Sequence, residues 1–386
     1  MKPWNLLFCL CLWFQETGAL SPQFLSCQLK KSSEESPLNG CPDGTIFVSP
    51  IDSRAQFTSV RDAILSLPLD GNSVILVGEG TYKEVVNITR SAPLTLLGQL
   101  DASALDSSTN ASARNLVHIW SDDFVRSGMD DAQSAVLIIS PTFNASLIGA
   151  GPTGAPLQPS FGNTDFKAYN IDFENRAANF SISQALVTDI SYANASFYGC
   201  TFASYQDTWY TGRDASTYVV DSIIFGQTDY LFGFGTAWFE SVTLANRACG
   251  GGIVAWKGTN QTDAQGNRYG AYINNSTIIR SPDANATLDI AGDCFLGRPW
   301  NDLATTVILR TFMDDSIAPS GWRPFGSGRS TIMNTTFYAE FDNYGPGANT
   351  SQRVSDHLLN STEAEEFTLE KVFLEKPKWI DFEYAY

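Results

Sequence analysis

Two pairs of polar residues recur at the same spacing in the middle of the chain. Gln184 and Gln206 are 22 residues apart, and so are Asp207 and Asp229. If one repeating unit of the fold has this length, each pair lies side by side on adjacent parallel strands, roughly 4.8 Å apart. Two carboxyl groups this close cannot both ionise freely, so the pair supplies an acid and a base, and aligned amides suit an oxyanion. The spacing predicts a catalytic site, and the alternative is an aspartate ladder on a solvated face.

A recurring four-residue pattern indicates the elements that hold these residues. It begins with a small or polar residue, ends with a bulky apolar one, and occurs at 170–173, 199–202, 222–225, 241–244, 275–278 and 334–337. The shorter steps fit one coil of a parallel β-helix, and the longer ones fit one or two coils with loops. The Asp-Gly hairpin signals, at 43–44 and 70–71, both precede these segments, which argues against an antiparallel sandwich. We therefore expect an all-β solenoid.

Other segments are expected to be caps, loops or leaders. Apolar residues at helical spacing predict a short capping helix over 58–67, and 363–374 is a second helical candidate. We interpret residues 20–44 as a flexible N-terminal lead-in, 45–386 as the β-helical domain, and 101–133 as a long polar insertion that holds His118 and could overhang the site.

The chain begins with a secretory signal pattern over residues 1–19. Lys2 precedes an apolar run from Leu6 to Phe14, which is too short to span a bilayer, and small residues lead to Ala19. Glycosylation sequons support a secreted, extracellular glycoprotein with no membrane anchor; they lie at Asn87, Asn110, Asn144, Asn179, Asn194, Asn260, Asn274, Asn275, Asn285, Asn334, Asn349 and Asn360.

Net charge limits the molecules that this chain can bind, and the cysteine count limits its possible disulfides. The net charge of −17 leaves no basic surface for nucleic acid, and an acidic protein binds a carboxylated polysaccharide best where its carboxyl groups are masked. Five cysteines follow the signal, so at least one is free or bridges chains; Cys27 and Cys41 could close a small loop, and Cys200 could be a core residue. No cysteine pair or histidine cluster indicates a metal, and we expect a monomer.

Five short motifs in order make the chain similar to the pectin methylesterase (pectinesterase) family. They read GTYKE at 80–84, QAL at 184–186, QDTW at 206–209, DYLFG at 229–233 and LGRPW at 296–300. The likeness covers about residues 48–382 and resembles the fungal, secreted members. It implies a right-handed parallel β-helix with short capping helices and long loops, acting without cofactor on methyl-esterified homogalacturonan of the cell wall.

The resemblance also implies roles for individual residues. Asp229 would be the nucleophile and Asp207 the general acid and base. Gln184 and Gln206 would stabilise the oxyanion, and Arg298 would pair with Asp229. Four aromatic residues would contact sugar: Trp300 and Trp322 as stacking platforms, and Trp209 and Tyr230 on the groove wall, where the family usually has Leu and Phe.

Three other functions compete with this interpretation. A serine esterase would need a G-x-S-x-G elbow and a partnered histidine, but the sequence has no such elbow, and His118 and His357 have no obvious nucleophile. A β-helical pectate or pectin lyase would use Arg298 as its base and leave the aligned amides unexplained. A catalytically silent pectin-binding protein would not need the complete set of polar residues.

Overall fold

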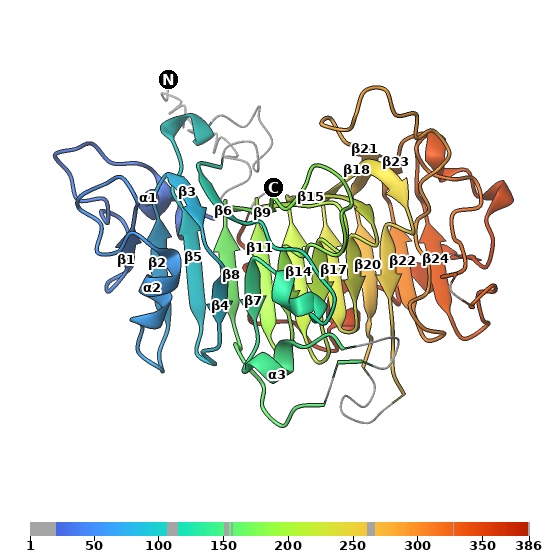
Figure 1. Ribbon diagram of the computed structural model, residues 1–386, viewed down its shortest axis with the longest axis horizontal. Coiled ribbons are helices and arrows are strands. Elements are labelled where there is room, and N and C mark those ends of the chain that lie inside the picture. The colour runs from blue at the N-terminus through green and yellow to red at the C-terminus, as the bar shows by residue number, and fades with distance from the viewer. Residues whose placement is uncertain are drawn as a thin grey trace, which may run out of the picture.

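The computed structural model describes residues 21–105, 115–149, 154–155, 157–260, 267–326 and 328–384. Over these residues the chain winds into a parallel β-helix whose coils follow one another along the long axis (Figure 1), and every ladder between named strands is parallel. The expected solenoid is therefore confirmed. The proposed signal, residues 1–19, lies outside the described residues.

Three sheets form the walls of the described coils. The eleven-stranded sheet contains β1 (Ile46–Val48), β2 (Ser73–Val77), β5 (Leu94–Gly98), β8 (Phe166–Tyr169), β11 (Asn194–Tyr198), β14 (Ser216–Val220), β17 (Thr236–Glu240), β20 (Gly270–Asn274), β22 (Thr305–Leu309), β24 (Phe337–Phe341) and β25 (His357–Leu358). The eight-stranded sheet contains β3 (Gly80–Lys83), β6 (Val117–Ser121), β9 (Asp172–Asn175), β12 (Thr201–Ala203), β15 (Ile223–Thr228), β18 (Thr243–Gly250), β21 (Thr277–Arg280) and β23 (Phe312–Met313). The six-stranded sheet contains β4 (Val86–Ile88), β7 (Leu137–Ile139), β10 (Thr188–Ile190), β13 (Trp209–Thr211), β16 (Leu231–Gly233) and β19 (Val254–Trp256).

On successive coils, a residue with left-handed backbone conformation turns the chain from the eleven-stranded sheet into the eight-stranded sheet. These corner residues are Asn170, Gly199, Asp221, Ser241, Asn275 and Arg310, with φ between 47° and 59°. Five of the six predicted segments begin at or next to these corners. The sixth, 334–337, is wrong as a member of the series, because Phe337 begins β24 of the eleven-stranded sheet and pairs with Thr305. In the eight-stranded sheet, the strand after β21 is instead β23, since Ile278 pairs with Met313. A polar residue followed by apolar ones is therefore found at the start of strands in more than one sheet.

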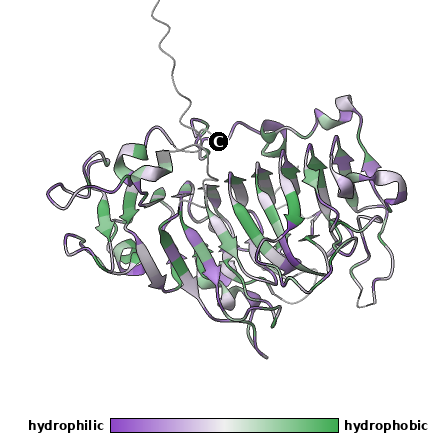
Figure 2. Ribbon diagram, turned by 90° about the horizontal axis from the view of Figure 1, so that it is seen from above, coloured by the Kyte–Doolittle hydropathy of each residue, from purple (hydrophilic) through white to green (hydrophobic). Residues whose placement is uncertain are grey.

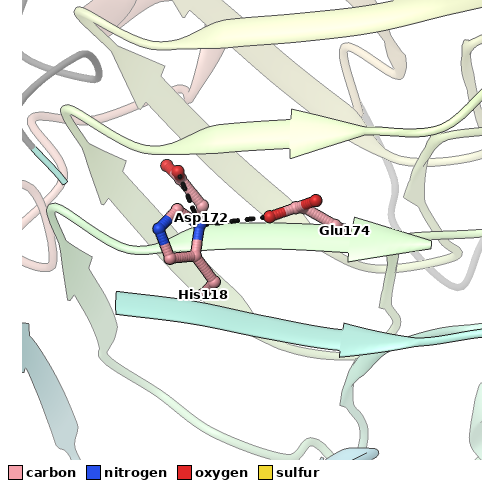
Figure 3. A group of neighbouring side chains, drawn as sticks. All are labelled: His118, Asp172 and Glu174. Carbon is pink, nitrogen blue, oxygen red and sulfur yellow. Dashed lines mark hydrogen bonds and ion pairs between the residues drawn. The ribbon is translucent and has the colours of Figure 1, made fainter. Parts of the chain in front are cut away.

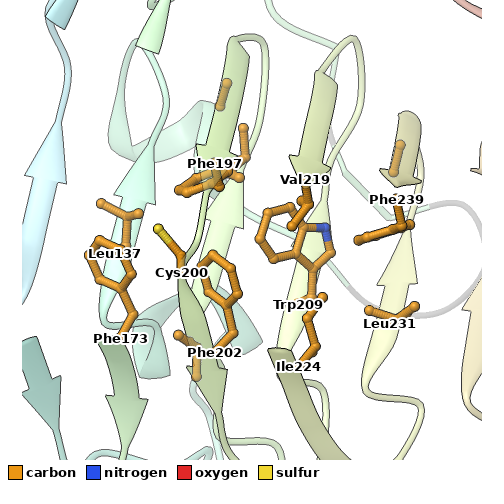
Figure 4. Close-up of a cluster of buried hydrophobic side chains, with 14 of the residues drawn as sticks. Leu137, Phe173, Phe197, Cys200, Phe202, Trp209, Val219, Ile224, Leu231 and Phe239 are labelled. Atoms are coloured by element: carbon orange, nitrogen blue, oxygen red, sulfur yellow. The ribbon is translucent and has the colours of Figure 1, made fainter. Parts of the chain in front are cut away.

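Apolar side chains from the three sheets fill the inside of the solenoid. Figure 2 shows hydrophobic segments on neighbouring strands and hydrophilic segments in many of the connecting loops. In the middle coils the interior is aromatic, with Phe197, Phe202 and Phe239 around the ring of Trp209 (Figure 4). Burying such side chains is the main stabilising contribution to the fold. Cys200 is buried here as a free thiol, as its expected role as a small core residue requires.

The N-terminal segment is not a free lead-in, which corrects the expectation for residues 20–44. A disulfide joins Cys27 to Cys41, and Phe24 packs edge-on against Tyr169 of the eleven-stranded sheet. The Gln28 amide donates to the carbonyl of Gly98 and to Asn170. These few contacts could not be predicted from the polar composition of the segment. The C-terminal segment returns to the same sheet, where Ser196 donates to the carbonyl of Trp379.

The helices are short and peripheral: α1 (Leu25–Gln28), α2 (Val60–Leu65), α3 (Phe143–Ser146), α4 (Ser361–Ala364) and α5 (Leu369–Val372). The helix expected over 58–67 is α2, capped by Ser59, and the candidate over 363–374 is divided between α4 and α5. A second disulfide joins Cys249 to Cys294. None of the helices in the described part of the chain is long and apolar enough to cross a membrane.

Candidate active site

The 22-residue spacing of the two aspartates is the offset between adjacent coils. Trp209 of β13 pairs with Leu231 of β16, and the Asp207 amide donates to the carbonyl of Thr228 at 3.1 Å. The glutamines share this offset, because the Ala185 amide donates to the carbonyl of Gln206 at 3.1 Å. All four residues line one cavity of about 570 Å³ on the outer side of the six-stranded sheet.

A left-handed backbone places each aspartate just before its strand. The φ angles are 58° at Asp207 and 48° at Asp229, values that a residue other than glycine adopts at a cost of about 1–3 kcal/mol. Aspartate tolerates this conformation better than most residues. The turn directs both carboxyl groups into the cavity, where each residue is only 7% exposed.

Arg298 holds Asp229 through a two-pronged ion pair. Its Nε lies 2.9 Å from Oδ1 and its Nη2 lies 2.5 Å from Oδ2, while the Gly252 amide donates to Oδ1 at 3.1 Å. The guanidinium is fixed in turn by the carbonyl of Phe325 at 2.9 Å and by the ring of Phe325, 4.3 Å away. Charge-assisted bidentate pairing keeps a carboxylate ionised and oriented.

Glycine at position 251 is required for this pair. Its φ is 55°, and a Cβ atom there would lie 2.7 Å from Oδ1 of Asp229 and 2.9 Å from Nη2 of Arg298. Any side chain would therefore push the two partners apart. The sequence contains Gly250, Gly251 and Gly252 in succession, but it gave no reason to prefer the middle one.

Asp207 is in the opposite electrostatic state. Its carboxyl group accepts no hydrogen bond from any of the described residues, and burial raises its pKa well above the ordinary value. The neighbouring carboxylates of Asp229 and Asp131 raise that pKa further, and only Arg298 opposes them. An acid that holds its proton more strongly than usual thus lies beside a carboxylate that is paired with arginine, an asymmetry that suits an acid and a nucleophile.

Both glutamines line the cavity, and the side-chain oxygen of each accepts a hydrogen bond from a serine. Ser183 donates to Oε1 of Gln184, and Ser181 donates to Oε1 of Gln206, each at 2.8 Å. Because the oxygens are already engaged, the NH₂ groups remain to donate to a developing negative charge.

The predicted aromatic contacts divide between the cavity and the interior. Trp300 lines the cavity, 5.7 Å from the ring of Phe232. Trp209, Tyr230 and Trp322 do not: their exposures are 0%, 0% and 1%, and all three belong to the core. Their assignment as sugar contacts is corrected.

The alternation of side chains along a strand explains the first of these errors. On β13, Trp209 faces inward and donates to Thr211 at 2.8 Å, while Tyr210 lies on the cavity side, 4.7 Å from Phe232. Tyr230 turns into the interior and donates to Asn246 at 2.8 Å. Trp322 stacks on Tyr338 at 4.0 Å. A residue type that suits sugar binding equally suits a core.

The structure adds cavity residues to which the sequence analysis assigned no role in the site. Phe232, Phe325, Met129, Asp130 and Asp131 line the wall. Phe232 could have been found by strand alternation, because it follows the inward Leu231. Part of the expected insertion overhangs the site as predicted, since Gly128 to Asp131 line the cavity, but 117–121 within it is the regular strand β6.

Asp131, which lines this wall, and Lys257, which lies beside Trp300, are two further titratable residues whose pKa values are shifted. Burial and Asp130 raise the pKa of Asp131 to about 6. Burial, followed by Arg213, lowers the pKa of Lys257 to about 7, and its Nζ lies 3.7 Å from the centroid of the Trp300 ring. A lysine under the ring supports the platform through a cation–π contact.

A family model described as Pectinesterase matches residues 157–376. The chain belongs to the pectinesterase family. Its curated relatives include pectinesterase/pectinesterase inhibitor 18 of Arabidopsis thaliana, 29% identical over 91% of this chain and 57% of the relative. Another is probable pectinesterase A of Neosartorya fischeri, 29% identical over 85% of this chain and 87% of the relative. The chain spans about half the length of the first plant pectinesterases that it matches.

Solved pectin methylesterases share the fold. The enzyme from Aspergillus niger superposes with a TM-score of 0.67 at 26% identity, covering 89% of this chain and 98% of that one. The enzyme from carrot gives a TM-score of 0.66 at 22% identity, covering 85% and 92%. The second likeness concerns the fold alone, and the first, together with the family match, supports the pectinesterase resemblance of the sequence.

Proposed function

We propose that this chain is a pectinesterase that hydrolyses the methyl esters of homogalacturonan to free carboxylates and methanol. The observation that carries the proposal is the contrast between adjacent carboxyl groups in one cavity, where Asp229 is paired with Arg298 and burial raises the pKa of Asp207. Family membership agrees with this chemistry.

In the proposed first step, an oxygen of Asp229 attacks the ester carbonyl carbon. The carbonyl oxygen becomes negative and accepts hydrogen bonds from the NH₂ groups of Gln184 and Gln206. The bond to the methoxy group then breaks, and Asp207 gives its proton to the departing methanol. An anhydride between the substrate and Asp229 remains, and Asp207 is left ionised.

In the second step, Asp207 takes a proton from a water molecule as that water attacks the anhydride. Cleavage releases the galacturonate carboxyl group and restores ionised Asp229, while Asp207 is again protonated. One water is consumed, and one methanol and one carboxyl group are formed. Arg298 steadies Asp229 throughout, and Trp300 supplies a platform for a sugar ring.

The rival functions fit this site less well. A lyase needs a free base to remove a proton from the sugar ring, but both prongs of Arg298 are engaged with Asp229. A serine esterase needs a histidine at the cavity, and neither His118 nor His357 lines it. A silent binding protein has no use for a buried acid with a raised pKa that accepts no hydrogen bond from the described residues.

We also propose that the protein is secreted to the cell wall as a monomeric glycoprotein. Among the described residues, the sequon asparagines at 87, 144, 179, 260, 275, 285, 334, 349 and 360 are exposed, as glycan attachment requires. Asn110 lies outside the described residues. Treatment with an N-glycosidase should lower the mass of protein from a eukaryotic host, and an unchanged mass would contradict glycosylation.

Product analysis tests the proposed activity. Purified protein with a chelator and highly esterified pectin should release methanol and new carboxyl groups in equal amounts. A product that absorbs in the ultraviolet, as an unsaturated uronide does, would show a lyase instead. Binding of pectin without either product would show a silent binding protein.

A further inference from the structure

One histidine and two acids converge on the outer face of the eight-stranded sheet, away from the cavity. His118 of β6 is the direct cross-strand partner of Asp172 on β9, and Glu174 lies two residues further along β9 on the same face. Figure 3 shows the ring nitrogen of His118 directed toward both carboxyl groups. The three side chains are partly exposed, between 14% and 35%, so a small solute can reach them.

Neighbouring donors fix the two acids. Asn115 donates to Oδ1 of Asp172 at 2.7 Å and is itself anchored on the carbonyl of Gly199 at 2.9 Å. Arg176 donates through Nε to Oε2 of Glu174 at 2.9 Å. Oδ2 of Asp172 and Oε1 of Glu174 are directed toward Nδ1 of His118, and Oε1 also accepts from Nη2 of Arg176. Carboxylates that bind a metal ion in proteins are usually held in place by such hydrogen bonds from neighbouring groups.

The separations between the ring nitrogen and the two carboxylate oxygens also suit a shared ion. Nδ1 lies 3.2 Å from Oδ2 of Asp172 and 3.2 Å from Oε1 of Glu174, and all three atoms lie within 4.8 Å of one another. In the absence of an ion, the same ring nitrogen hydrogen-bonds to Glu174 at 3.2 Å. Ligands at about 2.1 Å from a zinc-like ion are about 3.0–3.4 Å apart in octahedral or tetrahedral geometry.

We propose that His118, Asp172 and Glu174 form a binding site for a divalent transition-metal ion of the zinc class. One imidazole with two carboxylates is a typical ligand set for such ions, and water would complete the coordination. This proposal departs from the expectation of no metal, which rested on sequence spacing; β6 and β9 bring together residues more than fifty positions apart. It does not depend on the proposed esterase activity.

The site would act as a clamp between two neighbouring strands of the eight-stranded sheet. It joins β6 to β9, and the segment that follows β6 carries Asp130 and Asp131 into the cavity. Arg176 also contacts Oε1 of Glu174 at 3.0 Å and offsets part of its charge. We therefore expect weaker binding than in closed four-ligand sites, and a structural effect rather than a catalytic one.

Calorimetric titration of untagged, chelator-treated protein with zinc chloride tests the proposal. The wild type should bind one ion per chain, and zinc should raise its Tm by a few degrees. His118→Asn and Asp172→Asn should each weaken binding at least about tenfold, while His357→Asn, which removes the other histidine, should bind as the wild type does. No binding to the wild type, or equal binding by His118→Asn, would overturn the site.

X-ray absorption on the zinc-loaded wild type keeps the test decisive if a variant fails to fold. One imidazole nitrogen and at least two oxygen ligands at about 2.0–2.2 Å support the site. A shell that contains only oxygen, or one with sulfur, would show that zinc binds elsewhere and would overturn the assignment.

Discussion

The two sides of the six-stranded sheet use the same kinds of residue for different purposes. On the inner side, Trp209 is enclosed by phenylalanine rings and is 0% exposed. On the outer side, Trp300 rests on Phe232 and Lys257 at the cavity. A strand supplies both sides with alternate residues, so the face that a side chain occupies decides whether its loss affects stability or catalysis.

The largest effect should come from the outer side, at Asp229. Replacing Asp229 with Ala removes the nucleophile and should lower the rate of methanol release by about 10⁴-fold or more. Arg298 then loses its partner, so the fold should be checked by circular dichroism and thermal unfolding. Substantial turnover by a folded variant would remove Asp229 from this role.

On the inner side, Trp209→Ala should act through stability. Deleting a buried tryptophan leaves a cavity, and the free energy of unfolding should fall by about 3–5 kcal/mol. The KM of the protein that remains folded should stay near the wild-type value. Denaturant titration followed by kinetics below the unfolding transition separates the two effects, and a raised KM at unchanged stability would return Trp209 to the substrate groove.

Trp300→Ala is the matched substitution on the outer side. Loss of the ring should raise KM by about tenfold through lost stacking on sugar, with a much smaller change in Tm than Trp209→Ala gives. A fall in Tm as large as that of Trp209→Ala, with KM unchanged, would make Trp300 a packing residue.

The smallest effect should be a shift in pH dependence from Asp131→Asn. Asp207 must be protonated to release methanol, so activity should fall as pH rises through its raised pKa. Among the charged neighbours, Asp229 and Asp131 raise this pKa and Arg298 lowers it. Removing the Asp131 charge should therefore move the alkaline limb of kcat/KM to lower pH, by up to about one unit.

Asp122→Asn is the control, because Asp122 lies on the same segment but is exposed and pairs with Lys83. Its profile should match that of the wild type. If both variants shift equally, the effect belongs to the net charge of the protein and not to the cavity.

The sequence could predict the solenoid and the four central polar residues because both depend on spacing along the chain. The 22-residue offset of Asp207 and Asp229 is the length of one coil. Arg298 and Trp300 were found through the short motif LGRPW that contains them. The direction of each side chain is a property of three dimensions: the left-handed turn at Asp229 sends Tyr230 inward, and alternation sends Trp209 inward. The segment 334–337 shares the sequence pattern of the corner segments, although Phe337 begins β24 of the eleven-stranded sheet.

Contacts between distant segments could not be predicted. The packing of Phe24 on Tyr169 and the meeting of His118 with Asp172 depend on how loops of unequal length bring coils together. The requirement for glycine at 251 appears only once Asp229 and Arg298 are in place. Nothing in the local sequence around these residues predicts such contacts.

Infrared spectroscopy tests directly whether Asp207 carries a proton beside the Asp229–Arg298 ion pair. A difference spectrum of wild type minus Asp207→Asn at neutral pH removes the signals of other buried acids, such as Asp189, whose pKa burial also raises. We predict a carbonyl band of a protonated carboxyl group that is lost only at alkaline pH. A carboxylate band in its place at neutral pH, in folded and active protein, would contradict the assignment of Asp207 as the acid.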